Sequence, residues 1–133
     1  MAAAIAMGAL SLGTAVAHRP PAISTKLQIG LPTAITNAPN EFDLSASGPL
    51  SSSKSKCVAS RTVKLFFKSG HAKTLVDVDT TSRNGQWGVS GRARSTPHAF
   101  VVKVTPKRVE VHHHARICGA DQVVRKVTVI QPA

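Results

Sequence analysis

The chain has few acidic and aromatic side chains and almost no sulfur. Its 133 residues include six Asp and Glu, one Trp, no Tyr and two Cys. The two cysteines do not form a Cys-x-x-Cys motif, so no common zinc-site spacing is present. A Gly-rich phosphate loop and a serine in a Gly-x-Ser-x-Gly turn are also missing. The sequence therefore lacks the usual signatures of phosphate binding and of serine hydrolysis.

Long apolar runs are missing as well, except at the N-terminus. Residues 1–17 carry no charged side chain and end in Ala15-Val16-Ala17, the small-x-small pattern that signal peptidase accepts. The run contains glycine and is shorter than the ~20 residues that span a bilayer. We expect a cleaved signal peptide at 1–17, and hence a secreted protein of the cell envelope. No Lys or Arg precedes the run, and an uncleaved membrane anchor is the alternative interpretation.

Positive charge dominates the rest of the chain. Seventeen Lys and Arg against six Asp and Glu give a formal charge of +11, spread along the sequence rather than packed into one run. A basic exported protein is expected to meet acidic surroundings, namely cell-wall polymers, acidic glycans, lipid headgroups or stray nucleic acid, or another surface protein. If Arg83, Arg92 and Arg94 gather at one end of the fold, they form a polyanion contact. The alternative is a basic surface that serves only solubility.

Specific nucleic-acid binding is not indicated. Single-stranded nucleic acids are bound by aromatic stacking platforms beside basic residues, and only Phe66 is expected to face outward.

An even number of cysteines in an exported chain favours a disulfide, here between Cys57 and Cys118. The long loop that it closes gives a chain-entropy stabilisation of about 4 kcal/mol. A metal site that uses both sulfurs is the alternative.

Alternating apolar residues indicate strands from Cys57 onward. One strand has Val63, Leu65 and Phe67 on its inner face, another has Phe100, Val102 and Val104, and turn signals recur every 8–12 residues. We expect Val76 and Val78 inward, Asp77 and Asp79 outward, and a last strand with Val127 and Val129 on one face. This pattern predicts an all-β sandwich or barrel over 57–130.

The residues before Cys57 form a Pro- and Ser-rich segment, 18–56. Alternation around Leu27, Ile29 and Leu31 and over 41–47 predicts one or two edge strands in it. Gly48–Lys56 is predicted to be a loop.

The stretch DTTSRNGQWGV, from Asp79 to Val89, is predicted to be a hairpin. Asn84-Gly85 favours a type I′ turn, because both residues tolerate positive φ. Trp87 would then point between two sheets, where its ring buries a large area. The alternative is an exposed Trp87 that stacks against a sugar.

The order of these motifs resembles that of the transthyretin-like, carboxypeptidase-regulatory-like β-sandwich modules of secreted bacterial proteins. The resemblance covers roughly 57–130 and rests on Thr80, Thr81, Gly85 and Trp87 between the two cysteines. It implies a Greek-key sandwich of about seven or eight strands, usually without catalytic activity. It also implies a disulfide from the start of one strand to the start of the last.

Few residues suggest chemistry. His112 and His114 would share one face of a strand, with Glu110 beside them, and are weak metal candidates; an exposed polar loop is the alternative. Asp77 and Asp79 would share a face too, but glycosidic acid–base catalysis needs a cleft between its carboxylates. We therefore expect neither a catalytic site nor a cofactor.

Overall fold

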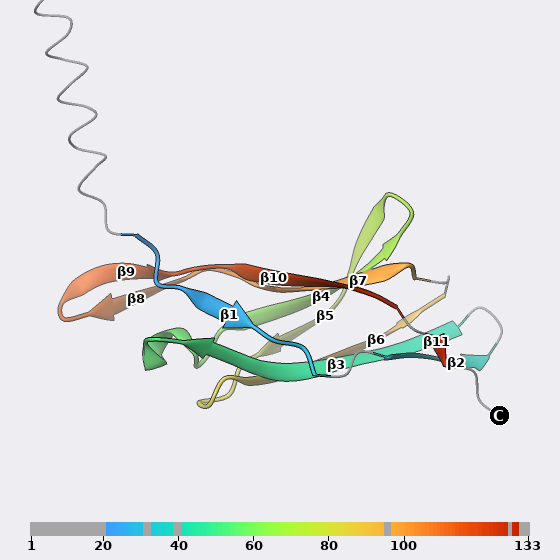
Figure 1. Cartoon of the computed structure of the whole chain (residues 1–133), viewed down its shortest axis with the longest axis horizontal. Coiled ribbons are helices and arrows are strands. Elements are labelled where there is room, and N and C mark those ends of the chain that lie inside the picture. The colour runs from blue at the N-terminus through green and yellow to red at the C-terminus, as the bar shows by residue number, and fades with distance from the viewer. Residues whose placement is uncertain (1–20, 31–32, 39–40, 95–96, 128, 131–133) are drawn as a thin grey trace, which may run out of the picture.

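The computed structural model describes residues 21–30, 33–38, 41–94, 97–127 and 129–130. The predicted signal peptide at 1–17 and Leu31 lie outside these residues. Two β-sheets pack face to face, and a hairpin extends one of the layers at its end (Figure 1). No helix in the described part is long and apolar enough to cross a membrane.

The longest strand, β3 (Glu41–Ser52), organises the five-stranded sheet. One side of β3 pairs with β6 (Gln86–Ala93), in antiparallel register from Phe42 to Pro49. The other side pairs with β1 (Thr25–Leu27) and β2 (Thr33–Ala38). The short β11 (Val129–Ile130) runs parallel to β2 and completes the sheet.

The four-stranded sheet has the order β10-β7-β4-β5, and all its neighbours are antiparallel. Its strands are β4 (Thr62–Ser69), β5 (Ala72–Thr80), β7 (Ala99–Val104) and β10 (Asp121–Lys126). The extending hairpin consists of β8 (Lys107–Val111) and β9 (His114–Cys118), between β7 and β10 in the chain. A short 3₁₀ helix, η1 (Ser55–Cys57), precedes β4.

The core between the layers confirms the all-β sandwich and its alternation. Val63, Leu65, Phe100, Val102 and Val104 have no exposed surface, as the period-two pattern predicts. They pack in one cluster with residues from the opposite sheet: Leu27, Leu44, Ala46, Leu50, Trp87 and Val89.

The segment 18–56 contributes more to the fold than the edge strands predicted for it. Its longest strand, β3, lies between other strands, and Leu27 of β1 belongs to the core cluster together with Leu44, Ala46 and Leu50 of β3. The described residues contain eleven strands, where about seven or eight were predicted. β1 and β11 span only three and two residues, so their alternation is too brief to predict from sequence.

The predicted loop Gly48–Lys56 is half strand. β3 continues through Gly48-Pro49 to Ser52, where the sequence indicated a break. A Cβ on Gly48 would overlap the carbonyl oxygen of Gln28, so glycine is required by close packing of backbones rather than by a turn. The Pro49 carbonyl still accepts a hydrogen bond from Gln28 N at 3.1 Å.

The last predicted strand is divided between the layers. β10 pairs with β7 in the four-stranded sheet, whereas β11 pairs with β2 in the other sheet. Val127 donates its N–H to His98 at 3.2 Å, between the two strands. The prediction that Val127 and Val129 share one face is wrong, because it assumed a single continuous strand. The side chain of Val129 is not among those described.

The predicted disulfide is confirmed. Cys57 and Cys118 are bonded, with their Cα atoms 5.4 Å apart and 61 positions separating them in sequence. Both are fully buried, in a small second cluster with Ile23. The bond fixes η1 to the end of β9.

The stretch around Asn84-Gly85 forms a turn but not a two-stranded hairpin. Gly85 has φ +85, and its N–H donates to Ser82 O at 2.9 Å, whereas Asn84 is not among the described residues with positive φ. β5 and β6, on either side of this turn, belong to different sheets. Trp87 is 4% exposed, which confirms the core interpretation. The type I′ prediction is wrong, because the chain must cross between layers here.

The two positive-φ glycines allow a matched test. A Cβ at Gly85 would overlap Leu50 O and the Val58 side chain, while at Gly70 (φ +60) it meets nothing within 4 Å. We expect Gly85→Ala to lower the free energy of unfolding by about 2–3 kcal/mol, from strain plus overpacking. Gly70→Ala should cost only about 1 kcal/mol. Urea titration of both variants checks this, and equal losses would contradict the packing argument.

Candidate functional site

A fully buried arginine is the most unusual polar residue of the described chain. Arg61 directly precedes β4 and has the same parity as the inward residues Val63 and Leu65, so its side chain enters the fold. Its exposed fraction is 0%. Thr81 holds its backbone, because Arg61 N donates to Thr81 Oγ1 at 2.9 Å and Arg61 O accepts from Thr81 N.

The guanidinium of Arg61 binds four oxygens from four separate parts of the chain. Nη1 donates to Cys57 O at 2.7 Å and to Thr25 Oγ1 at 3.1 Å. Nη2 donates to Thr105 O and Gly119 O, both at 2.8 Å. These bonds connect β1, η1 and the loops that flank the β8–β9 hairpin.

No carboxylate of the described residues balances the charge of Arg61. Its acceptors are three backbone carbonyls and a hydroxyl, and its Nε has no hydrogen-bond partner within this part of the chain. Burial lowers the pKa of Arg61 from its ordinary value, because desolvation disfavours the charged form. A positive charge beneath the surface attracts anions to the surface above it.

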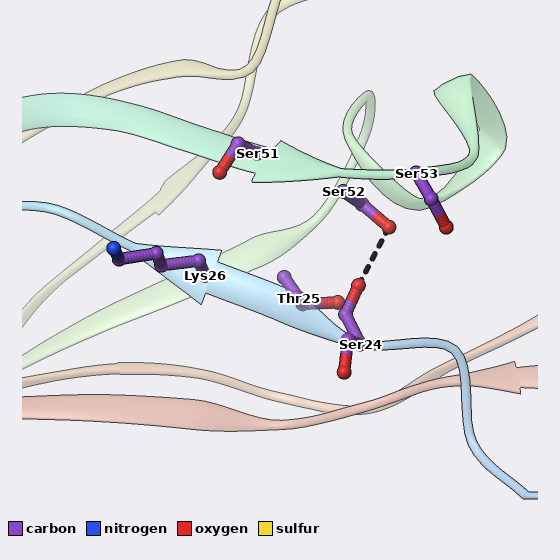
Figure 2. Close-up of a pocket in the computed structure, with 6 residues that line it drawn as sticks. All are labelled: Ser24, Thr25, Lys26, Ser51, Ser52 and Ser53. Atoms are coloured by element: carbon purple, nitrogen blue, oxygen red, sulfur yellow. Dashed lines mark hydrogen bonds between the residues drawn. The ribbon is translucent and has the colours of Figure 1, made fainter.

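A hydroxyl-rich hollow lies beside this arginine. We call it the serine hollow; it has a volume of about 550 Å³ and is lined by Ser24, Thr25, Lys26, Ser51, Ser52 and Ser53. Figure 2 shows Lys26 and Ser51 toward one end of it and the side chains of Ser24, Ser52 and Ser53 at the other. Ser52 Oγ donates to Ser24 O at 2.7 Å, which joins the ends of β1 and β3.

Thr25 connects the serine hollow to the buried charge. It lines the hollow, and its Oγ1 accepts a hydrogen bond from Arg61 Nη1. This bond polarises the threonine hydroxyl, so that its proton is a better donor. Together with the ammonium of Lys26, the hollow therefore offers hydrogen-bond donors and positive charge to an acidic group.

Three carboxylates connect the two sheets at their open sides. Asp77 Oδ2 accepts from Ser90 N at 2.8 Å, and Asp79 Oδ2 accepts from Gly88 N at 2.9 Å, so both bind the free edge of β6. On the opposite side, Asp121 Oδ2 accepts from Leu27 N of β1 at 2.9 Å. These bonds satisfy edge N–H groups that would otherwise be open to pairing with another chain.

The outward orientation predicted for Asp77 and Asp79 is therefore wrong. A register shift in the β4–β5 pairing, between Leu65 and Phe66, inserts Val76 as an extra residue and turns both carboxylates toward the inner side. For the same reason Val78, which was expected inward, is 49% exposed.

The three arginines predicted to form a polyanion contact are not all brought together. Arg83 lies in the turn that precedes β6, whereas Arg92 and Arg94 lie at the far end of that eight-residue strand. Arg92 binds acidic residues instead: Nε is 2.8 Å from Asp43 Oδ1, and Nη1 is 4.0 Å from Glu41 Oε2. The hydrogen bond to Asp43, with the charges of both carboxylates, raises the pKa of Arg92.

The histidine cluster forms a turn rather than a strand face. His112 and His113 connect β8 to β9 and have φ +51 and +67, the positive values that a type I′ turn requires. His114 begins β9 opposite Val111. The shared strand face predicted for His112 and His114 is therefore wrong. Within the described residues, no group of three or more His, Cys, Asp or Glu is arranged to hold a metal ion.

This turn gives a prediction about stability. Residues with a side chain are strained at positive φ, although His tolerates it better than most. We expect His112→Asn with His113→Gly to raise the free energy of unfolding by about 0.5–1 kcal/mol. The control is His114→Gly, which places glycine in a strand and should destabilise. Thermal unfolding distinguishes them, and a destabilised turn variant would show that the contact of His113 with Glu110 outweighs the strain of the turn.

The sequence contained one unused signal for the buried arginine: its position in the inward series of β4. The serine hollow had no such signal, because its two halves lie in segments interpreted as an edge strand and a loop. Comparisons of this chain with protein-family models, with curated proteins and with solved structures give no match. The resemblance to transthyretin-like modules therefore stays a hypothesis.

Proposed function

We propose that this protein is a secreted, non-catalytic interaction module of the cell envelope that binds acidic polymers through its basic surface. The observation that carries the proposal is how the six carboxylates are used. Asp77, Asp79 and Asp121 accept backbone N–H groups, and Glu110 lies beside His113. Only Arg92, among the Lys and Arg of the described residues, is paired with carboxylates.

The basic charge is consequently left for an external partner. A chain with a formal charge of +11 and few internal ion pairs has a positive field around it, which attracts and concentrates polyanions. The serine hollow is the best-equipped contact for their acidic groups, because hydroxyl donors, the Lys26 ammonium and the buried charge of Arg61 act there together.

The non-catalytic part of the proposal is supported by groups that are already engaged. The two cysteines are bonded to one another, so neither is a free thiol nucleophile. Asp77 and Asp79 are the pair that glycosidic chemistry would use, and one oxygen of each accepts a hydrogen bond from a backbone N–H of β6.

Retention on an immobilised acidic polysaccharide tests the proposal. We expect the chain to bind polygalacturonate at low ionic strength, to release at about 0.5 M salt, and not to bind neutral dextran. Lys26→Gln with Lys54→Gln, beside the serine hollow, should weaken binding severalfold because two charges near the hollow are lost.

The matched control removes two charges on another surface, with Lys64→Gln and Lys103→Gln. It should weaken binding less than the hollow variant. Equal retention on dextran and on polygalacturonate, or retention that does not change with salt concentration, would rule out a charge-driven polymer contact.

A further inference from the structure

The outer face of the four-stranded sheet carries an apolar row with exposed ends, while its middle residue Val101 is only 3% exposed. Phe66 pairs across strands with Leu75 on one side and Val101 on the other, and Val101 pairs with Val124. We call Leu75, Phe66, Val101 and Val124 the apolar row. Leu75 and Val124, at its ends, are 48% and 47% exposed. No described strand packs over this face, and the core lies on the opposite side of the sheet.

Lysines border the apolar row on both sides. In the rows that flank it, Lys64 pairs with Lys103, and Lys68 pairs with Lys73. Lys126 extends the second of these rows, opposite Ala99. Lys73 also lies over the Phe66 ring, with Nζ 4.4 Å from its centroid.

The arrangement of these lysines is unfavourable for the stability of the sheet. Like charges directly opposite each other on neighbouring strands repel, and two such pairs occur on this one face. The outward positions of β4, β5, β7 and β10 contain no Asp or Glu, since Asp77, Asp79 and Asp121 point to the inner side. The charge that relieves this repulsion must therefore come from outside the sheet.

We propose that this face docks flat on an anionic lipid bilayer. Five ammonium groups in two rows complement a plane of acidic headgroups, and each basic side chain near such a surface contributes about fivefold to binding. The apolar row, which lies between the two rows of lysines, enters the interfacial region of the bilayer and buries apolar surface there. A hydrophilic acidic polymer offers no such apolar environment. A second copy of this chain does not fit, because lysine would face lysine. This contact goes beyond the proposed polymer binding and uses a different surface.

Co-sedimentation with vesicles tests the proposal on the full chain. The vesicles are phosphatidylcholine alone, or phosphatidylcholine with about one third phosphatidylglycerol, in about 0.15 M salt. We expect binding only to the second kind. Lys64→Gln with Lys103→Gln should lower the partition coefficient about 25-fold. Leu75→Ser with Val124→Ser should lower it at least about fivefold, because apolar area is lost from the interface.

Two controls remove the same chemistry elsewhere. Ile117→Ser removes an apolar side chain that is 45% exposed on β9, away from this face, and should leave binding unchanged. Lys54→Gln with Lys56→Gln removes two charges and should reduce binding far less than the face variant. Trp87 fluorescence, from a buried indole, checks that each variant is folded.

A second measurement detects membrane contact directly and does not depend on variants that bind vesicles less well. Leu75→Trp should shift its emission to the blue and be quenched by brominated lipid, whereas Ile117→Trp should not. The proposal is overturned if phosphatidylglycerol gives no preference, or if the Leu75→Ser, Val124→Ser variant binds vesicles fully, which would indicate a charge-only polyanion surface. Loss of vesicle binding by the face variants with retained polygalacturonate binding would separate this contact from the serine hollow.

Discussion

Replacement of Arg61 by alanine is expected to lower the free energy of unfolding by about 3–5 kcal/mol. The substitution removes the donor that Arg61 supplies to Cys57 O, Thr105 O and Gly119 O, and an unsatisfied buried polar group costs about 1–3 kcal/mol. It also opens a cavity where a fully buried side chain lay. Urea unfolding at equilibrium, followed through Trp87 fluorescence, measures the loss.

Arg92→Ala is the control for this experiment. The Arg92 side chain is 60% exposed and makes ion pairs at the surface, where water screens them, so its removal should change the free energy of unfolding far less than the removal of Arg61. Arg61→Lys keeps the charge, but a single ammonium cannot reach four acceptors spread around a planar guanidinium, so an intermediate loss is expected. Arg61→Ala and Arg92→Ala with equal stability would contradict the role assigned to Arg61.

Removal of the disulfide is expected to cost about 4 kcal/mol. The bond closes a loop across 61 positions, and the chain-entropy relation for loops of that size gives this value. Domains of this size have only ~5–15 kcal/mol of net stability, so Cys57→Ser with Cys118→Ser should lose a large share of it. Denaturant titration of the double variant beside the wild type measures the difference.

Reduction of the wild type provides the matched control. With reductant, its unfolding midpoint should move to that of the double variant, because both then lack the same bond. An unfolding midpoint of the wild type that does not change with reductant would contradict the stabilising role of the bond. Because Cys57 O also accepts from Arg61, the Arg61 and cysteine substitutions are expected to be non-additive.

Strands with several alternating residues on a buried face could be predicted from sequence. β4 and β7 were identified correctly because Val63, Leu65, Phe100 and Val102 have no exposed surface and alternate strictly. β3 was identified only in part, since Gly48-Pro49 has the composition of a turn. Its straight continuation depends on the close approach of Gln28, a contact made by a distant segment.

Turn chemistry was misleading for a related reason. Asn-Gly favours a tight hairpin, but Asn84-Gly85 lies where the chain passes from one sheet to the other. The turn with two positive φ values is instead His112-His113, a pair that local preference would not select. Tertiary pairing of β8 with β9 imposes it. Local propensity therefore predicted that turns exist, but not their geometry.

The candidate site was the least predictable part. A register shift of one residue decides which way Asp77 points, and no local feature of the sequence marks it. The acceptors of Arg61 come from positions 25, 57, 105 and 119, so only the complete fold assembles them. The pairing of Cys57 with Cys118 was accessible, because two cysteines allow only one intramolecular bond.

The spread of the acceptors around Arg61 has a consequence for biosynthesis. A growing polypeptide shorter than about 120 residues lacks the Gly119 carbonyl and the second sulfur, so an early-collapsed intermediate would trap a poorly solvated cation. Vectorial folding during translation is thereby disfavoured until nearly all of the chain has emerged.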